Sequence, residues 1–296
     1  MLAQARRFFA ERGLLEVDPS ALVLRAPIDA NIDVIEASVT DSEKGFLHTS
    51  PEYAMKRLLV AGAPDLYFLG HVFRKGEVGR LHNPEFTMAE WYRHGFSLEQ
   101  MIEETCAFLF LFLGPLPVRT VSYREAFAQY VKVDYTRDDL SPFLPPHAQG
   151  WSRATARHYL LSHQIEPQLG QGELTVLTDY PPSEAALAAV VEKKGERVAE
   201  RFEIYYQGVE LTNGYHELSD DATLRERFEE ENALRASKGQ KPYALDEPFL
   251  SAMQQGLPPC CGVSVGFDRA LMLRHKAPSL QDVLIFSWPL SDTAPT

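Results

Sequence analysis

The sequence predicts an α+β fold in which a mainly antiparallel sheet is flanked by helices. Strand-like segments come as hairpins, as at 202–206 and 209–212 around Gln207-Gly208, and helical patterns lie between the hairpins. The regular strand–helix alternation that builds parallel sheets is not evident, and neither G-x-G-x-x-G nor G-x-x-x-x-G-K-S/T occurs. Helices packed against an antiparallel sheet account for this pattern.

Local patterns place each expected element. Helical spacing predicts helices at 3–12, 52–60, 98–113, 153–164, 184–192, 220–237 and 268–275. The helix at 52–60 has a clear start, because Ser50 can cap it and Pro51 fits its first position. Further strands are expected at 14–17, 65–73, 86–93, 175–178 and 263–266. Residues 75–84 and the proline-rich stretch 141–150 are expected to be loops.

Composition describes an ordinary globular chain. Its 296 residues are 45% hydrophobic and 24% charged, so a core can form without disulfides. Cys106, Cys260 and Cys261 make neither a disulfide framework nor a C-x-x-C metal motif, and they fit a reducing compartment. Because no apolar stretch is long enough for a bilayer and no signal-peptide pattern starts the chain, we expect a cytoplasmic protein without a membrane partner.

The acidic balance bears on the partner. The formal net charge is −12, whereas proteins that bind nucleic acids usually present a basic face. The charge therefore weighs against tRNA as the main partner, although only weakly, since it says nothing of local patches. A basic substrate with ammonium groups suits it better.

A pair of carboxylates is expected on the hairpin at 202–212. If Gln207-Gly208 forms the turn, Glu203 shares one face with Tyr205, Glu210 and Thr212. Carboxylates side by side repel each other, and Mg²⁺ would relieve the repulsion while it binds phosphate oxygens. A solvated acidic hairpin edge explains the same spacing, so both interpretations stay open here.

A third glutamate follows at the same interval. Glu217 has the opposite strand parity to Glu203 and Glu210. A β-bulge near Asn213-Gly214 could turn it to the same face.

Two further segments have the composition of phosphate-binding elements. The loop in FRKGEVGRLHNPEF carries three cations and a histidine, and Phe86 offers a flat face for a purine. An ordinary polar hairpin loop is the alternative. In GVSVGFDR, a glycine-containing strand leads into a helix, where Arg269 lies in the first turn against the helix dipole. An anionic ligand would compensate for that position.

Together these segments resemble the class II aminoacyl-tRNA synthetases. FRKGEVGRLHNPEFTMAEWY resembles their motif 2, GVSVGFDR resembles motif 3, and RFEIYYQGVELTNGYHEL is similar to the matching segment of lysyl-tRNA synthetases. TSPEYAMKRLLVAG and FFAERGLLEVDP also match. The resemblance extends from residue 3 to residue 287, except around 137–172. It implies a class II catalytic core with a mainly antiparallel sheet.

One branch of that family is the best match. Lysyl-tRNA synthetases carry an N-terminal anticodon-binding domain, whereas this sequence starts at the catalytic core. The chain is similar to the elongation factor P–(R)-β-lysine ligases, particularly in SPEYAMKRLLVAG and GRLHNPEFTMAEWYR. We expect residues 1–296 to form a single catalytic domain without an anticodon-binding domain.

The resemblance implies that ATP and Mg²⁺ are bound. Arg74 would hold the α-phosphate and the substrate carboxylate, and Phe86 and Arg269 would sandwich the adenine; the two arginines are the catalytic candidates. Glu203 and Glu210 would be the Mg²⁺ ligands. Further ATP contacts are expected from Glu77, Asn83, Glu210, Leu211 and Gly266.

The resemblance also implies a pocket for β-lysine or lysine. Glu217 and Tyr92 would hold the side-chain ammonium, and Glu52 and Glu90 would lie near the other amine. Ser50, Asn213, Tyr215 and Ser264 are expected in the same pocket. Because an unpaired buried carboxylate is unfavourable, such a site should reject neutral analogues.

Three departures from the family pattern matter. Motif 2 normally has a glutamate where Gly76 stands, so we expect Glu77 or a backbone carbonyl to accept from the adenine amine. Ser264 replaces a glycine of lysyl-tRNA synthetases, and we hypothesise that it favours a β-amino acid. Segment 18–20 departs from motif 1, which forms the dimer interface in this family; a homodimer is still expected.

The implied reaction has two steps. The amino acid is activated as its adenylate and is then transferred to a lysine ε-amine of elongation factor P. Aminoacylation of tRNA or a tRNA-like RNA with lysine is one alternative, and a catalytically dead, synthetase-like regulatory module is another. A third, ammonia-dependent asparagine synthetase, would need a pocket cation for its substrate's second carboxylate.

Overall fold

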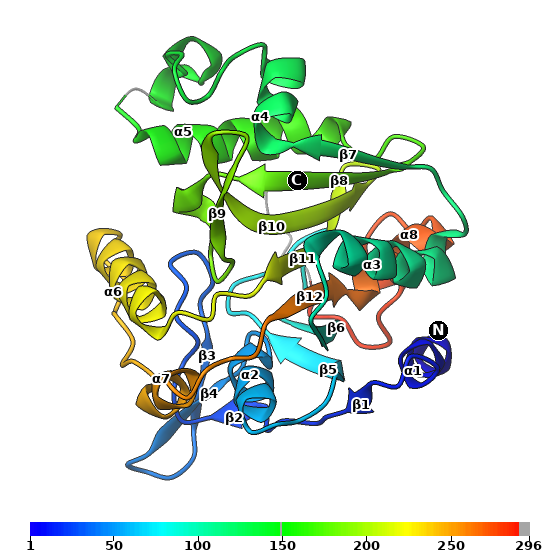
Figure 1. Ribbon diagram of the computed structural model, residues 1–296, viewed down its shortest axis with the longest axis vertical. Helices are drawn as coiled ribbons and strands as arrows, with labels where there is room; N and C mark the ends of the chain where they lie inside the picture. The colour runs from blue at the N-terminus through cyan, green and yellow to red at the C-terminus, as the bar shows by residue number, and fades with distance from the viewer. Residues whose placement is uncertain (149, 290–296) are drawn as a thin grey trace.

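A long twisted sheet runs through the molecule (Figure 1). The computed structural model describes residues 1–148 and 150–289. The strand order is β1-β5-β6-β12-β11-β10-β8-β7, with β9 paired to β10. The β1–β5 and β7–β8 pairs are parallel and the other pairs are antiparallel. The predicted α+β class with a mainly antiparallel sheet is confirmed.

The elements have the following bounds. The strands of the large sheet are β1 (Leu15–Glu16), β5 (Leu66–Phe73), β6 (Glu85–His94), β7 (Val118–Ser122), β8 (Leu174–Tyr180), β9 (Val190–Lys193), β10 (Glu196–Tyr206), β11 (Val209–His216) and β12 (Cys260–Gly266). A smaller sheet has the order β2-β4-β3 and consists of β2 (Leu22–Val23), β3 (Ile35–Ser38) and β4 (Lys44–Leu47). The helices are α1 (Leu2–Ala10), α2 (Glu52–Val60), α3 (Leu98–Leu113), α4 (Tyr123–Ala126), α5 (Arg153–Leu160), α6 (Asp221–Ser237), α7 (Glu247–Met253) and α8 (Phe267–His275).

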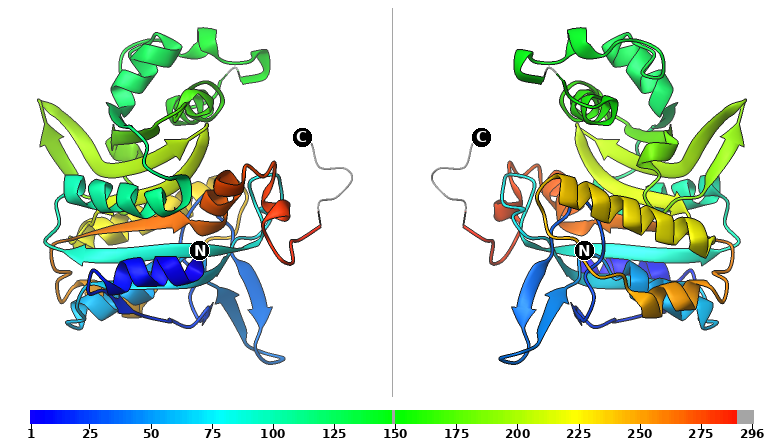
Figure 2. Two further views of the ribbon diagram at one scale, coloured as in Figure 1. Left: turned by 90° about the vertical axis from the view of Figure 1, so that its right-hand side faces the viewer. Right: turned by 90° about the vertical axis from the view of Figure 1, so that its left-hand side faces the viewer.

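Helices cover the two faces of the large sheet differently. On one face lie α1 and α3 (Figure 2, left). They pack through an aromatic cluster in which Phe9 stacks on Tyr67 with ring centroids 4.3 Å apart. On the other face, α2, α6 and α7 form a second core in which Tyr53 stacks on Phe249, also at 4.3 Å (Figure 2, right). A third core around Tyr123 joins α4 and α5 to the β7–β8 edge. The second face is therefore covered at both ends, and the cavities described below lie between.

Most predicted elements are present, and two details are wrong. Residues 184–192 do not form a helix: Ala186 has a φ of +47°, and β9 pairs with β10. Strand pairing thus outweighs the helix propensity of the alanine-rich run. Ser50 precedes the N-cap of α2, which is Pro51, although its Oγ does accept a hydrogen bond from the Glu52 amide.

Several elements had no counterpart in the prediction. The small sheet is made of strands too short to show alternation, and β7, α4 and α7 were also missed. The expected loop at 141–150 contains two short 3₁₀ turns, and its residue 149 lies outside the described part of the chain. None of the helices that the structure describes is both long and apolar enough to cross a bilayer.

Candidate active site

A β-bulge in the β10–β11 hairpin arranges the acidic side chains. The predicted turn is present, and Tyr205 lies opposite Glu210. One step further the register shifts, so that Ile204 pairs with Thr212 and Leu211 has no partner across the strands. The Thr212 hydroxyl accepts a hydrogen bond from the Ile204 amide at 3.0 Å. Because a bulge adds one residue, side-chain parity reverses beyond it.

The reversal brings the three glutamates to one face. Asn213 lies opposite Glu203, and Glu217 follows on the same side as both. The expected position of Thr212 on the Glu203 face is therefore wrong. The bulge that re-aims Glu217 exists, but it falls at Leu211 rather than at the expected Asn213-Gly214.

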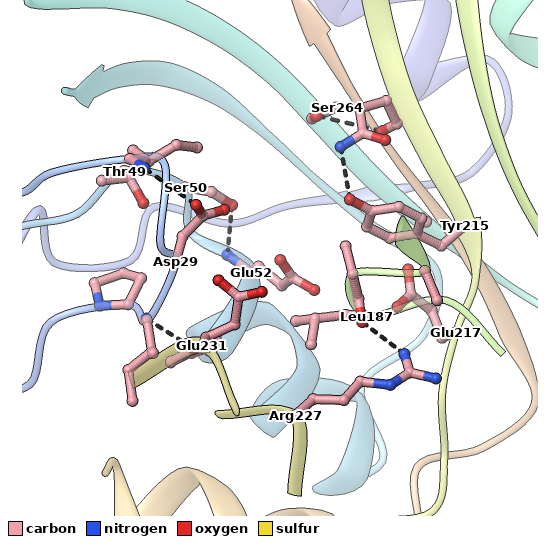
Figure 3. A pocket seen from close by; sticks show the side chains of 18 of the residues that line it. Asp29, Thr49, Ser50, Glu52, Leu187, Tyr215, Glu217, Arg227, Glu231 and Ser264 are labelled. Atoms are coloured by element: carbon pink, nitrogen blue, oxygen red, sulfur yellow. Dashed lines mark hydrogen bonds between the residues drawn. The ribbon is translucent and has the colours of Figure 1, made fainter. Parts of the chain in front are cut away.

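Two adjoining cavities lie on this face. The larger measures about 720 Å³, and among its lining are all the residues expected to bind ATP or metal: Arg74, Glu77, Asn83, Phe86, Glu203, Glu210, Leu211, Gly266 and Arg269. The smaller measures about 240 Å³, and its lining includes all those expected to bind the amino acid: Ser50, Glu52, Glu90, Tyr92, Asn213, Tyr215, Glu217 and Ser264 (Figure 3). Ten residues line both cavities, and Arg74, Asn213, Tyr215 and Ser264 are among them.

Arg74 and Arg269 enter the larger cavity from distant segments. The Arg74 guanidinium lies 5.1 Å from the centre of the Phe86 ring and 3.6 Å from Glu77 Oε1. Arg269 donates to the backbone oxygens of Glu210 and Leu81 at 3.0 and 3.2 Å. Arg269 lies in the first turn of α8. The two contacts hold its side chain against the wall of the larger cavity.

The backbone conformation at residue 76 favours glycine over the glutamate that motif 2 normally has there. Gly76 has a φ of +79°, a left-handed conformation in which a residue with a Cβ is strained. Glu77 lines the cavity in its place. Asn83 is 5% exposed, and its amide donates to Glu85 O and accepts from the Trp288 amide. The predicted contact of Asn83 with ATP thus competes with a role in holding the loop.

Neighbouring side chains in the sheet offset the negative charge of Glu203. It accepts hydrogen bonds from Tyr180 and Tyr205 and pairs with Arg201 at 2.5 Å. Glu210 lies more openly in the cavity, with 40% of its side chain exposed. Partial burial, and then the Glu203 carboxylate, raise the pKa of Glu210.

Glu166 adds a third carboxylate that the sequence did not reveal. Burial, followed by repulsion from Glu203 and Glu210, raises the pKa of Glu166 to about 7. The structure describes no cluster of three or more His, Cys, Asp or Glu side chains arranged as metal ligands. A cation beside Glu203 and Glu210 would therefore share them with oxygens of a ligand, as Mg²⁺ does with phosphates.

The smaller cavity is built around buried acids. Ser50 Oγ donates to Glu90 Oε2 at 2.7 Å, and Tyr92 OH donates to Glu90 Oε1 at 2.8 Å. Tyr92 therefore pairs with Glu90 in the empty pocket, and its expected contact with the side-chain ammonium of the substrate stays a prediction. Burial, and then the Glu52 carboxylate, raise the pKa of Glu90 to about 8.

Glu217 has an unexpected partner from α2. Lys56 Nζ lies 2.6 Å from Glu217 and 2.6 Å from Glu52, which precedes it by one helical turn. Burial raises the pKa of Glu217 to about 7, although the Lys56 ammonium opposes the shift. The i, i+4 spacing of Glu52 and Lys56 could have suggested their ion pair from the sequence. No sequence signal pointed to the contact between Lys56 and Glu217.

A glycine and a polar chain complete the pocket. A Cβ on Gly262 would collide with Glu217 Oε1 and the Tyr92 ring, so only glycine fits there. Asn213 donates to Tyr215 OH at 2.6 Å, and Ser264 Oγ donates to Asn213 O at 3.3 Å.

Residues 182, 183 and 185–187 form part of the wall of the smaller cavity. Arg227 of α6 donates to Ala186 O at 2.6 Å and to Ala188 O at 2.8 Å. These bonds join this part of the wall to α6; Arg227 and Leu187 are labelled in Figure 3.

This sheet, with its arginine-bearing motifs and acidic pocket, is that of a class II synthetase core: the family model for class II tRNA synthetases (D, K and N) matches residues 1–288. Similar relatives are the elongation factor P–(R)-β-lysine ligases of Hamiltonella defensa, 36% identical, Photorhabdus laumondii, 38% identical, and Salmonella dublin, 37% identical. Each alignment covers 97% of this chain and 92% of the relative. The chain belongs to the class II tRNA synthetase family, in the group that contains these ligases, and it is a ligase. The predicted resemblance is confirmed.

Proposed function

We propose that the chain activates (R)-β-lysine, or lysine, as the adenylate and transfers it to a lysine ε-amine of elongation factor P. Relatives named for this reaction align with 97% of the chain. The observation that carries the proposal is the junction of the two cavities at Arg74. On one side lie groups suited to a nucleotide, and on the other lie carboxylates suited to ammonium groups.

The charges of the smaller cavity support a diamino acid. Its acidic lining residues are Asp29, Glu52, Glu90, Glu217, Glu230 and Glu231, and its basic lining residues are Arg74 and Arg227. The acidic excess attracts a substrate that carries two ammonium groups. The second carboxylate of aspartate would meet repulsion, which argues against the asparagine synthetase alternative.

In the first step the substrate carboxylate attacks the α-phosphorus of ATP. The new bond joins a carboxylate oxygen to phosphorus, and the bond to pyrophosphate breaks. From the shared rim of the cavities, Arg74 can contact both the carboxylate and the phosphate, offset their repulsion and hold them in line. Arg269 and Phe86 would hold the adenine, with Glu77 or a loop carbonyl accepting from its amine.

The pair Glu203 and Glu210 would hold Mg²⁺, which supplies charge neutralisation for the phosphates and the leaving pyrophosphate. The raised pKa of Glu210 supports this assignment, because a cation at that place would relieve repulsion between the two carboxylates.

In the second step the acceptor ε-amine attacks the carbonyl carbon of the adenylate. The amide bond forms, the carbonyl–phosphate bond breaks, AMP leaves, and the amine nitrogen gives up one proton, which passes to solvent. The amine must be neutral to attack, whereas its pKa in water is about 10.4.

The test offers the enzyme both acceptors. Purified chain is incubated with ATP, (R)-β-lysine, elongation factor P and bulk tRNA, and each acceptor is analysed by intact mass. We expect elongation factor P to gain one β-lysyl group and tRNA to gain none. Loading of tRNA would favour the aminoacylation alternative, and absence of both AMP formation and product would favour the catalytically dead module.

A further inference from the structure

Lys56 is a buried cation in the wall of the carboxylate cavity. Its side chain is 1% exposed, and its Nζ lies 2.6 Å from both Glu52 Oε1 and Glu217 Oε2. The contact with Glu52 is a hydrogen bond, whereas the contact with Glu217 lies outside hydrogen-bonding angles and is an ion pair. Since an unpaired buried ammonium is strongly unfavourable, these two carboxylates determine where Lys56 lies.

The same two carboxylates belong to the substrate pocket. Glu52, Glu90 and Glu217 repel one another there, and repulsion from Glu52 adds to burial in raising the pKa of Glu90 and Glu217. Burial alone would lower the pKa of Lys56, but Glu217 and Glu52 together raise it, so Lys56 stays an ammonium.

We infer that Lys56 is a positioning residue that sets the substrate's charge class. Its ammonium holds Glu52 and Glu217 in place and offsets one charge of the group Glu52, Glu90 and Glu217. When the substrate binds and all three are ionised, two of their charges are left for the two substrate ammonium groups, while Arg74 meets the substrate carboxylate. The choice of a diamino acid rests on the proposed function; the positioning of the two carboxylates does not.

The surroundings explain how the positions are kept. Gly262 has no Cβ and so leaves the space that Glu217 Oε1 and the Tyr92 ring occupy, and the Glu217 side chain is 1% exposed. Glu90 is held separately by Ser50 and Tyr92. The substrate thus meets acids that are already oriented, which lowers the entropy lost on binding.

The test separates this role from a purely structural one. ATP–pyrophosphate exchange is measured with (R)-β-lysine and with 3-aminohexanoate, which lacks the distal ammonium. In Lys56→Met we expect KM for β-lysine to rise about tenfold or more, the preference for β-lysine to fall by a similar factor, and KM for ATP to change little. Lys56→Arg keeps the charge and should restore most of the preference. Lys44→Met removes an exposed ion pair with Glu36 and is the matched control.

Equal losses in Lys56→Met and Lys56→Arg, or an unchanged preference in Lys56→Met, would overturn the inference. A second arm needs no substrate: Lys56→Met should lower Tm more than Lys56→Met/Glu217→Gln does, because the double variant removes one orphaned charge. If the wild type activates no diamino acid, the proposed function and the charge-class claim fail together. The Tm comparison then still decides the positioning, and equal Tm values would refute it.

Discussion

Binding of the amino acid should depend steeply on pH through Glu90. Burial and the Glu52 carboxylate raise the pKa of Glu90 to about 8, so the empty pocket holds Glu90 protonated at pH 7. A bound ammonium requires the ionised form, and one pKa unit corresponds to about 1.36 kcal/mol. The affinity for (R)-β-lysine should therefore fall about tenfold for each pH unit below 8. Protonation of Glu217, whose pKa is about 7, would steepen the fall further.

Isothermal titration calorimetry measures this directly. Titrations between pH 6 and 8 give the slope, and buffers of different ionisation heat give the protons released on binding. We expect about 1.4 protons to be released at pH 7, most of them from Glu90 and the rest from Glu217. Glu90→Gln should bind more weakly with a much flatter pH profile, whereas the exposed Glu36→Gln should keep the wild-type slope. A dissociation constant that does not change between pH 6 and 8, without proton release, would refute the reasoning.

The same shift has a consequence for stability. Glu90 has an ordinary pKa of 4.5, and its folded-state pKa is raised. Its contribution to folding is therefore fully present below about pH 4.5 and is lost as pH rises through about 8. In the ligand-free protein, the contribution of Glu90 to Tm should fall as pH rises across that range. Bound β-lysine should reverse this fall.

Three substitutions test other parts of the site. Gly262→Ala should raise KM for the amino acid about tenfold or more with little change in KM for ATP, because the new Cβ collides with Glu217; equal effects on both would contradict the assignment. Glu203→Gln should abolish exchange and lower the free energy of unfolding by about 3 kcal/mol, measured by denaturant titration, since Arg201 loses its buried partner; full stability would speak against that ion pair. Ser264→Gly should shift activation toward L-lysine relative to (R)-β-lysine, and an unchanged ratio would remove the hypothesis that this hydroxyl selects the β-amino acid.

Sequence motifs predicted much of the site because its residues come from short segments with fixed spacing. Arg74, Glu203, Glu210 and Arg269 were all placed in this way, and the structure brings them to one cavity. The position of the bulge could not be predicted. It depends on how Leu211 packs in the core, and only that packing decides on which face Glu217 lies.

Other features depend on tertiary contacts that leave no local pattern. Lys56 and Glu166 look like surface residues in the sequence, yet both lie beside carboxylates brought from distant strands. The expected helix at 184–192 failed for a related reason. Its alanines favour a helix locally, but Ala186 has a positive φ, residues 190–193 pair with β10, and Arg227 bonds the backbone oxygens of Ala186 and Ala188.

The central claim is that one ligand spans both cavities across Arg74. A crystal structure with a non-hydrolysable β-lysyl-adenylate analogue tests it most directly. The account predicts the adenine beside Phe86 and Arg269, the phosphate analogue against Arg74, and the two ammonium groups among Glu52, Glu90 and Glu217. An analogue bound with its amino-acid portion outside the acidic cavity, or with no contact to Arg74, would contradict it.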